Sequence, residues 1–181
     1  MKVKDLVYIA IFTSIICVMS LVTIPTTVPF TLQTMAIFLC MFMLKPTDAI
    51  ISVLLYILIG AIGLPVFSNF NSGFGVLAGP TGGYIIGFII MPFMPIIIKN
   101  KIASAIVGLI ICYIFGTIWF LMFNTSGIKS IWKVLTICVL PFIIPDGIKL
   151  TLAYLLSRRL KFLTDDEVID ETINEEEKDT I

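Results

Sequence analysis

The chain has 181 residues, of which 59% are hydrophobic and 13% charged, and its mean hydropathy is +1.09. Soluble domains are about half apolar and about a quarter charged, so this composition excludes an ordinary water-soluble protein and indicates that the lipid bilayer is the solvent. The formal net charge is zero, but the charges are unevenly distributed. Residues 1–163 contain eleven Lys or Arg and three acidic residues, whereas residues 164–181 contain nine acidic residues and one lysine.

Long apolar stretches predict an all-α integral membrane protein in which six transmembrane helices form one bundle. The expected spans are residues 6–24, 30–44, 49–62, 84–98, 102–123 and 133–160. The second, third and fourth are only about 14 to 15 residues long, whereas a perpendicular crossing takes about 20 residues. The number and the ends of these three spans are therefore the least constrained part of the prediction.

The positions of the cations predict the orientation of the bundle. Basic residues concentrate on the cytoplasmic side of a membrane, and eight of them fall on one side of the six-span arrangement while two fall opposite. The eight are Lys2, Lys4, Lys45, Lys99, Lys101, Arg158, Arg159 and Lys161, and the two are Lys129 and Lys133. We expect a multi-pass protein of the plasma membrane with both termini in the cytoplasm.

Small residues in the first and fourth spans indicate close helix packing. Ala10 and Ser14 lie one turn apart, and Gly83 and Gly87 repeat this spacing. Such a pair allows close approach by another helix, either in this chain or in a partner. On the spacing alone, packing within the chain is the default interpretation of both pairs.

Gln33 lies early in the second span, after a Pro-rich turn around Pro25 and Pro29. An amide side chain both donates and accepts hydrogen bonds, so Gln33 can bind a ligand or join two helices. The sequence leaves these two interpretations open.

A long loop, residues 67–83, connects the third and fourth expected spans and predicts a lid over the bundle. Its glycines permit positive φ, and its apolar side chains supply bulk that a solvated linker does not need. These side chains are Phe67, Phe70, Phe74 and Leu77. The alternative is an interfacial loop that anchors aromatic rings at the lipid headgroups. Asn71 in this loop either orients a ligand or serves only as a turn residue.

Asp146 and Lys149 are the charged side chains expected well inside a span, three residues apart on one helix face. A charge inside the membrane is costly and indicates function, although the two groups could simply neutralise each other. Asp146 lies about 18 Å along the helix from Arg158, at about 1.5 Å per residue, which places it in the outer half of the membrane. A carboxylate acceptor beside an ammonium donor suits a polar headgroup that has both N–H and C=O groups, such as a urea-like ring.

Residues 164–181 have too little apolar surface to offset the entropy of ordering, so we expect a disordered cytoplasmic tail after a membrane domain of residues 1–163. The chain has no histidine, and between Asp48 and Asp146 it has no acidic residue. We therefore expect no metal and no cofactor, and we expect no nucleic-acid partner. A G-x-x-x-x-G-K-[ST] phosphate loop is also missing, so any nucleotide-driven transport requires ATPase activity from another subunit.

These motifs resemble the BioY family, the biotin-specific S components of energy-coupling factor (ECF) transporters, over nearly all of residues 3–162. The matching pieces are Leu32-Gln33-Thr34, Gly60-Ala61-Ile62-Gly63-Leu64-Pro65-Val66-Phe67, Gly79-Pro80-Thr81-Gly82-Gly83-Tyr84 and Pro145-Asp146-Gly147-Ile148-Lys149. The resemblance implies a six-helix S-component fold that encloses biotin.

The resemblance also implies roles for individual residues. Asn71 matches a lid asparagine, and Asp146 and Lys149 match a polar pair near the ligand. We expect Gln33, Tyr84 and Phe74 to contact the ligand as well. In the first helix, an Ala-x-x-x-Ala pattern that meets the transmembrane coupling subunit corresponds to Ala10 and Ser14. Some relatives carry a basic residue where this chain has Ile85, which leaves open the group that binds the ligand carboxylate.

The resulting hypothesis is non-covalent capture of biotin from outside, closure of the lid, and delivery to the cytoplasm with the coupling subunit and two ABC-type ATPase subunits. On this hypothesis the chain itself is not an enzyme. The alternatives are an S component for a different vitamin, an intramembrane enzyme with Asp146 and Lys149 as an acid/base pair, and a receptor or scaffold with no ligand.

Overall fold

The structure is a computed structural model that describes residues 2–24, 29–123 and 131–160. The acidic segment 164–181 lies outside the described residues, so its disorder stays a prediction, and Pro25, Lys129 and Lys161 lie outside them as well.

The described residues form an all-α bundle, as predicted. Three helices are long and apolar enough to cross a membrane, namely Val3–Leu21, Lys101–Phe123 and Trp132–Leu160, and three shorter apolar helices accompany them, namely Gln33–Met43, Pro46–Ile62 and Gly82–Ile97. In element order these are α1 Val3–Leu21, α2 Gln33–Met43, α3 Pro46–Ile62, α5 Gly82–Ile90 continued by η2 Met91–Phe93 and α6 Met94–Ile97, α7 Lys101–Phe123, α8 Ile131–Cys138 and α9 Leu140–Leu160.

The ends of several predicted spans were wrong. The first helix stops at Leu21 because Thr23–Ile24 (β1) pairs with Phe30–Thr31 (β2) as a short antiparallel hairpin. The third begins three residues earlier than predicted, at Pro46, since proline suits the first turn of a helix, where its missing N–H costs nothing. The last predicted span is divided by a turn at Val139 between α8 and α9.

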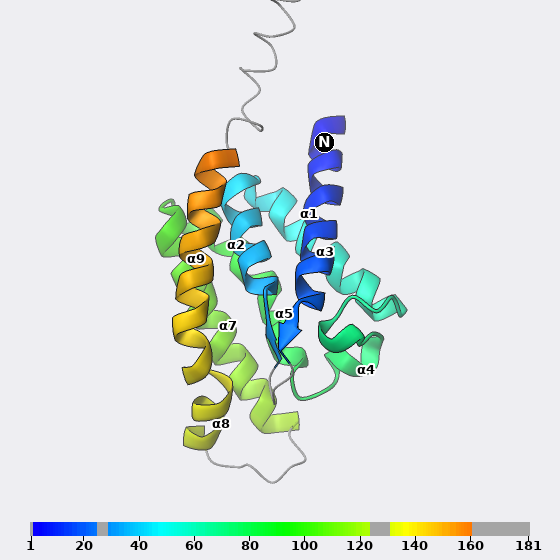
Figure 1. Cartoon of the computed structure of the whole chain (residues 1–181), viewed down its shortest axis with the longest axis vertical. Helices are drawn as coiled ribbons and strands as arrows, with labels where there is room; N and C mark the ends of the chain where they lie inside the picture. The colour runs from blue at the N-terminus through cyan, green and yellow to red at the C-terminus, as the bar shows by residue number, and fades with distance from the viewer. Residues whose placement is uncertain (1, 25–28, 124–130, 161–181) are drawn as a thin grey trace, which may run out of the picture.

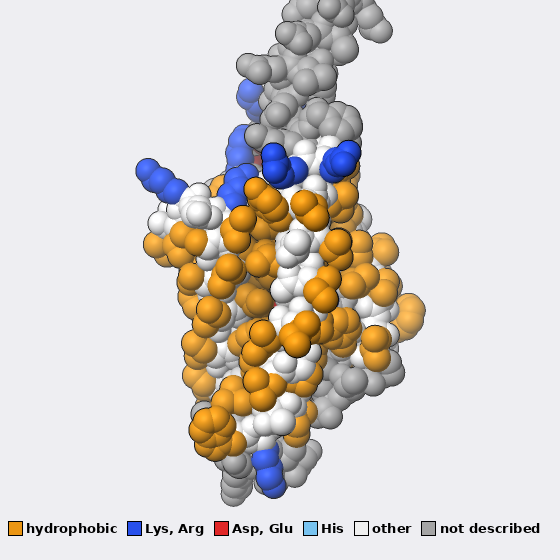
Figure 2. Space-filling view, turned by 60° about the vertical axis from the view of Figure 1, so that its left-hand side comes forward, with side chains coloured by type: hydrophobic (Ala, Val, Ile, Leu, Met, Phe, Trp, Pro, Cys, Tyr) orange, Lys and Arg blue, Asp and Glu red, His pale blue; other side chains and the backbone are white. Residues whose placement is uncertain are grey.

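Both described ends of the chain lie at the same end of the bundle, where α1 begins and α9 ends (Figure 1). The hairpin, the short helix α4 (Phe74–Leu77) and α8 lie at the opposite end. On the face that Figure 2 shows, apolar side chains cover the middle of the molecule, most of the visible Lys and Arg side chains gather at the end with the termini, and further basic atoms lie at the opposite end. An apolar belt bounded by charged ends is the surface expected of a protein that crosses a bilayer.

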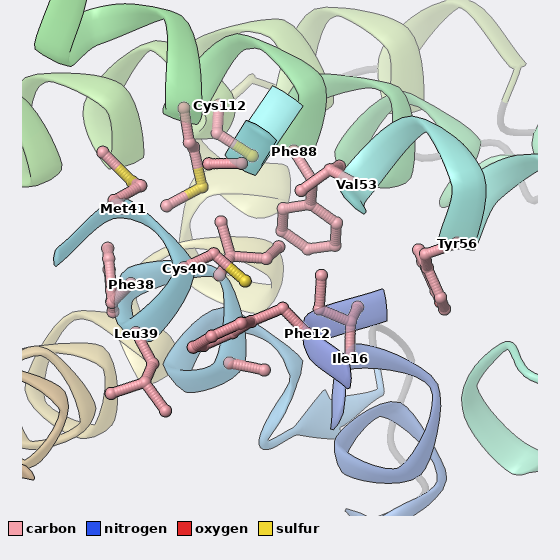
Figure 3. Close-up of a cluster of buried hydrophobic side chains, with 14 of the residues drawn as sticks. Phe12, Ile16, Phe38, Leu39, Cys40, Met41, Val53, Tyr56, Phe88 and Cys112 are labelled. Atoms are coloured by element: carbon pink, nitrogen blue, oxygen red, sulfur yellow. The ribbon is translucent and has the colours of Figure 1, made fainter. Parts of the chain in front are cut away.

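Helix α2 forms the centre of the bundle, packed against α1 and α3 on one side and α9 on the other. Figure 3 shows Cys40 of α2 pointing toward the part of the buried cluster that Phe12 of α1 and Phe88 of α5 form. The buried residues of α2 are Gln33, Thr34, Ala36, Ile37, Phe38, Leu39, Cys40, Met41 and Phe42. Because protein surrounds α2 on nearly every side, this helix of 11 residues is stable without spanning the lipid by itself.

Glycines permit the close contact between α5 and α7, as predicted for Gly83 and Gly87. A Cβ at Gly83 would lie 2.2 Å from Trp119 Cβ, and a Cβ at Gly87 would lie 2.9 Å from the sulfur of Cys112. Gly116 of α7 accepts the ring of Tyr84 in the same way. This contact fixes the position of Tyr84.

We expect Gly60→Ala to destabilise the protein by about 1 to 3 kcal/mol, the usual cost of overpacking a core. The ring of Phe67 lies against Gly60, and a Cβ there would come within 2.3 Å of it. Gly147→Ala is the matched control, because a Cβ on that helical glycine meets nothing within 4 Å. Thermal unfolding of both variants in detergent checks this, and equal unfolding temperatures would contradict it.

Candidate ligand-binding site

A cavity lies between the helices at the end of the bundle that carries the hairpin. About 670 Å³ of space here is free of protein atoms, a figure that includes the open solvent at its mouth. Its walls come from α2, α3, α5, α7, α8 and α9, from the hairpin, and from the loop after α3. The lining residues are Pro29, Thr31, Gln33, Thr34, Tyr56, Ser68, Thr81, Tyr84, Ile85, Phe88, Leu109, Cys112, Tyr113, Cys138, Phe142, Asp146 and Lys149.

Asp146 and Lys149 form a buried ion pair in the wall of this cavity, with 2.7 Å between Lys149 Nζ and Asp146 Oδ1. Asp146 is 1% exposed and Lys149 is 4% exposed. The Thr34 hydroxyl donates to the same carboxylate oxygen at 2.9 Å, and the Tyr113 hydroxyl donates to the other. The two groups therefore neutralise each other, which was one interpretation of the sequence. They also form part of the cavity wall, where a ligand could reach them.

The ammonium group of Lys149 is fully engaged. Besides Asp146, it donates to the backbone carbonyl of Thr31 at 2.7 Å and to the Thr34 hydroxyl at 3.1 Å. It also lies 4.0 Å from the centroid of the Phe30 ring, a cation–π contact. Three contacts use the three donors of an ammonium, whereas the carboxylate of Asp146 keeps one lone-pair position, on Oδ2, for a further donor. In this arrangement the pair presents an acceptor to the cavity.

The amide of Gln33 lies in the cavity wall at the start of α2, 4% exposed. Its Nε2 makes no hydrogen bond with any residue that the structure describes. A polar neighbour on another helix is Tyr56 of α3, with which Nε2 makes no contact of hydrogen-bond geometry, so its position suits a ligand contact. The hydroxyl of Tyr56, on α3, lines the same cavity and is likewise unpaired among the described residues.

Tyr84 also lines the cavity, as expected from the sequence, but its hydroxyl lies 3.3 Å from the Thr117 hydroxyl. Its ring packs on Gly116 of α7. Tyr84 thus contributes a fixed aromatic wall, and its polar atom already has a partner.

The loop after α3 contains η1 Ser68–Phe70 and α4 Phe74–Leu77. Phe67 is completely buried and its ring meets that of Tyr56 edge-on, with centroids 5.6 Å apart. At its other end the indole of Trp119 donates to the Gly79 carbonyl at 3.0 Å. Ser68 and Thr81 of this loop line the cavity. A loop fixed at both ends beside a cavity agrees with the expected lid.

Two predicted ligand contacts in the lid do not line the cavity in this structure. Asn71 is exposed and its amide donates to the Ser68 carbonyl at 2.9 Å, which is the geometry of a turn residue. Phe74 is 73% exposed. Their roles as ligand contacts stay predictions, and both would require movement of the lid.

Three cavity residues that the sequence did not single out as site residues are Thr34, Tyr56 and Tyr113. Thr34 belongs to the Leu32-Gln33-Thr34 motif, and its neighbour Gln33 was the only signal for it. Tyr56 and Tyr113 are phenols within otherwise apolar helices, and a buried phenol that needs a polar partner is a usable signal. Their convergence on one cavity depends on helix packing.

Ala10 and Ser14 lie on the outer face of α1, and both are exposed. The Ser14 hydroxyl is bonded to the Ala10 carbonyl at 2.9 Å. Together with their neighbours they form a shallow groove whose lining residues are Ala10, Ile11, Ser14, Ile15, Val18 and Met19. Packing within the chain, the default interpretation of this pair, was wrong.

Known proteins are similar to this chain over nearly its whole length. The family model described as BioY family matches residues 1–166. A protein named biotin transporter BioY from Thermotoga maritima is 39% identical over 168 residues, which are 88% of this chain and 97% of that protein. A probable biotin transporter BioY from Pyrococcus horikoshii is 34% identical over 167 residues, 89% of this chain and 98% of that protein.

A solved structure shows the same fold. A 2.1 Å crystal structure of the S-component for biotin from an ECF-type ABC transporter superposes with a TM-score of 0.77 at 30% sequence identity. The match covers 88% of this chain and 91% of that chain.

Proposed function

Because this chain belongs to the BioY family, we propose that it is the biotin-binding S component of an ECF-type vitamin transporter and takes up biotin across the membrane. The observation that carries the proposal is the buried Asp146–Lys149 pair in the wall of a mainly apolar cavity. A charged pair that only stabilised the bundle would gain little from lining a cavity. A ligand with a polar head and an apolar body fits this wall.

Biotin has groups that match the cavity. Its ureido ring carries two N–H groups and a carbonyl, and its thioether ring and aliphatic chain are apolar. The free lone-pair position of Asp146 suits a ureido N–H, and the aromatic walls from Tyr84, Phe88 and Phe142 suit the apolar part. Asn71 and Phe74 are proposed to join the site when the lid closes over the ligand.

The proposed orientation in the plasma membrane follows the charges. The basic end, where α1 begins and α9 ends, faces the cytoplasm, so both termini are cytoplasmic and the cavity opens outward. The transmembrane coupling subunit and two ABC-type ATPases are the proposed partners. In support of this, the chain has no phosphate loop of its own, and the groove at Ala10 and Ser14 is exposed on α1.

Equilibrium binding of labelled biotin to the purified protein tests the proposal. We expect saturable binding with a submicromolar dissociation constant, recovery of unchanged biotin, and competition by unlabelled biotin but not by thiamine or riboflavin. Competition by another vitamin would assign the protein to that ligand instead. Absence of any biotin binding would overturn the proposal and favour a scaffold, and conversion of the ligand would favour an enzyme.

A further inference from the structure

Gln33 Nε2 and Tyr56 Oη form a second polar feature of the cavity, apart from the Asp146–Lys149 pair. Both are buried side-chain atoms without a hydrogen-bond partner among the described residues. Gln33 is 4% exposed and Tyr56 is completely buried. Buried polar groups are nearly always paired, so an unpaired donor in a cavity wall indicates a partner that arrives with the ligand.

The two groups belong to different helices and come together at the base of the lid. The Tyr56 hydroxyl lies within hydrogen-bonding range of the side chains of Gln33 and Ser20, but neither contact has the geometry of a hydrogen bond. The Ser20 hydroxyl already donates to backbone carbonyls, at 2.7 Å in the case of Cys17, so it has no hydrogen left for the ligand. Figure 3 shows Tyr56 of α3 at the edge of the buried cluster to which Phe12, Val53 and Phe88 also belong.

The two polar features have opposite character. All three donors of Lys149 are engaged by protein oxygens, and the free capacity of the pair is the carboxylate of Asp146, an acceptor. Gln33 Nε2 and the Tyr56 hydroxyl, in contrast, are donors for which no acceptor among the described residues has hydrogen-bond geometry. A ligand that gives an N–H to Asp146 therefore still needs a donor for each of its own oxygens.

We propose that Gln33 and Tyr56 form a donor subsite that receives an oxygen of the ligand carrying no hydrogen. This inference rests on the proposed function. In biotin, two groups have this chemistry, the carboxylate and the ureido carbonyl. The subsite recognises this ligand oxygen through uncharged donors. It therefore needs no cation in addition to Lys149 among the described lining residues.

Binding of labelled biotin to Gln33→Met and Tyr56→Phe tests the subsite. Each substitution keeps the bulk of the side chain and removes one donor, so we expect affinity to fall about tenfold in each variant. Gln33→Glu has the shape of the wild-type side chain but replaces the donor by an acceptor, and we expect a loss of about a hundredfold. Tyr154→Phe is the matched control, since Tyr154 packs against Phe42 outside the cavity, and it should bind as wild type.

A biotin analogue whose chain ends in a methyl group instead of the carboxylate identifies the oxygen. If the subsite holds the carboxylate, Gln33→Met and Tyr56→Phe weaken biotin but leave the affinity for the analogue unchanged. If it holds the ureido carbonyl, the two variants weaken both ligands equally. Thermal unfolding of each variant establishes that the bundle is intact.

Wild-type affinity in Gln33→Glu, or equal effects of Tyr56→Phe and Tyr154→Phe, would overturn the donor subsite while leaving biotin capture in place. Failure of the wild-type protein to bind biotin would instead overturn the proposed function. The two failures are thus distinguishable in one series of titrations.

Discussion

Asp146→Asn is expected to raise the dissociation constant for biotin by about a hundredfold, a loss of about 2.7 kcal/mol. The carboxylate oxygens of Asp146 accept bonds from Thr34, Tyr113 and Lys149, which leaves one lone-pair position on Oδ2 of this cavity-lining residue. An amide replaces one of these acceptors by a donor, so the position that suits a ureido N–H is lost. Titration of purified protein with labelled biotin measures the change.

The same substitution removes one partner of a buried ion pair and leaves the Lys149 ammonium unpaired, which costs about 3 to 5 kcal/mol of stability. The double variant Asp146→Asn with Lys149→Met separates the two effects, because it removes both charges. We expect the double variant to regain much of the unfolding temperature but not the affinity for biotin. If it regains both, the pair is structural only and does not touch the ligand.

Asp48→Asn is the matched control for these titrations. Asp48 is also a buried aspartate, but it lies in the first turn of α3, which begins at Pro46 next to Lys45. Lys45 pairs with Asp5 at the start of α1, so this position belongs to the basic end of the bundle. We expect unchanged affinity for biotin in this variant.

The part of the site that the sequence predicted was the pair of charged side chains inside an otherwise apolar span. Asp146 and Lys149 could be found because a charge inside a span is costly and therefore rare. Their spacing of three residues also places them on one helix face, and the ion pair that the structure shows was one of the two interpretations of this spacing. Gln33 was ambiguous for the opposite reason, since an amide is tolerated both in helix packing and in a binding site.

The unpredictable part depended on how helices pack. Tyr113 and Thr34 reach Asp146 from positions 33 and 112 residues away along the chain, and no local pattern indicates such a contact. Tyr56 is one of five tyrosines, and the sequence does not tell a cavity phenol from one in the core or at the lipid interface. The direction in which a side chain points around a helix bundle is set by tertiary contacts.

The ends of the spans were missed for a similar reason. Residues 23–24 and 30–31 each combine a threonine with a large apolar residue, and hydropathy does not distinguish a short hairpin of this composition from a helix turn. Helix α2 can be short because α1, α3 and α9 pack around it. A span length derived from the thickness of the bilayer assumes that each helix crosses the lipid by itself, so it does not predict such a helix. The membrane bundle as a whole was predictable because the chain is much more apolar than soluble domains are.

Ser14→Trp is expected to abolish biotin uptake by cells that contain the ECF coupling subunit and ATPases, while the purified variant binds biotin as wild type does. Ser14 is exposed in the groove of α1, and its side chain is turned back onto the Ala10 carbonyl. Small residues allow another helix to approach closely, and an indole at this position fills the groove. The cavity lies elsewhere in the bundle and does not include Ser14.

Two variants make this test decisive. Ile110→Trp places the same indole on the exposed surface of α7, where Ile110 is 50% exposed, and it should leave uptake intact. Ser14→Ala keeps a small residue and should also transport biotin, because the hydroxyl bonds only to its own helix. Normal uptake by Ser14→Trp would show that the coupling subunit binds elsewhere, and equal losses in Ser14→Trp and Ile110→Trp would indicate an effect on membrane insertion. Loss of uptake with full binding, confined to α1, would separate the surface that captures the vitamin from the surface that delivers it.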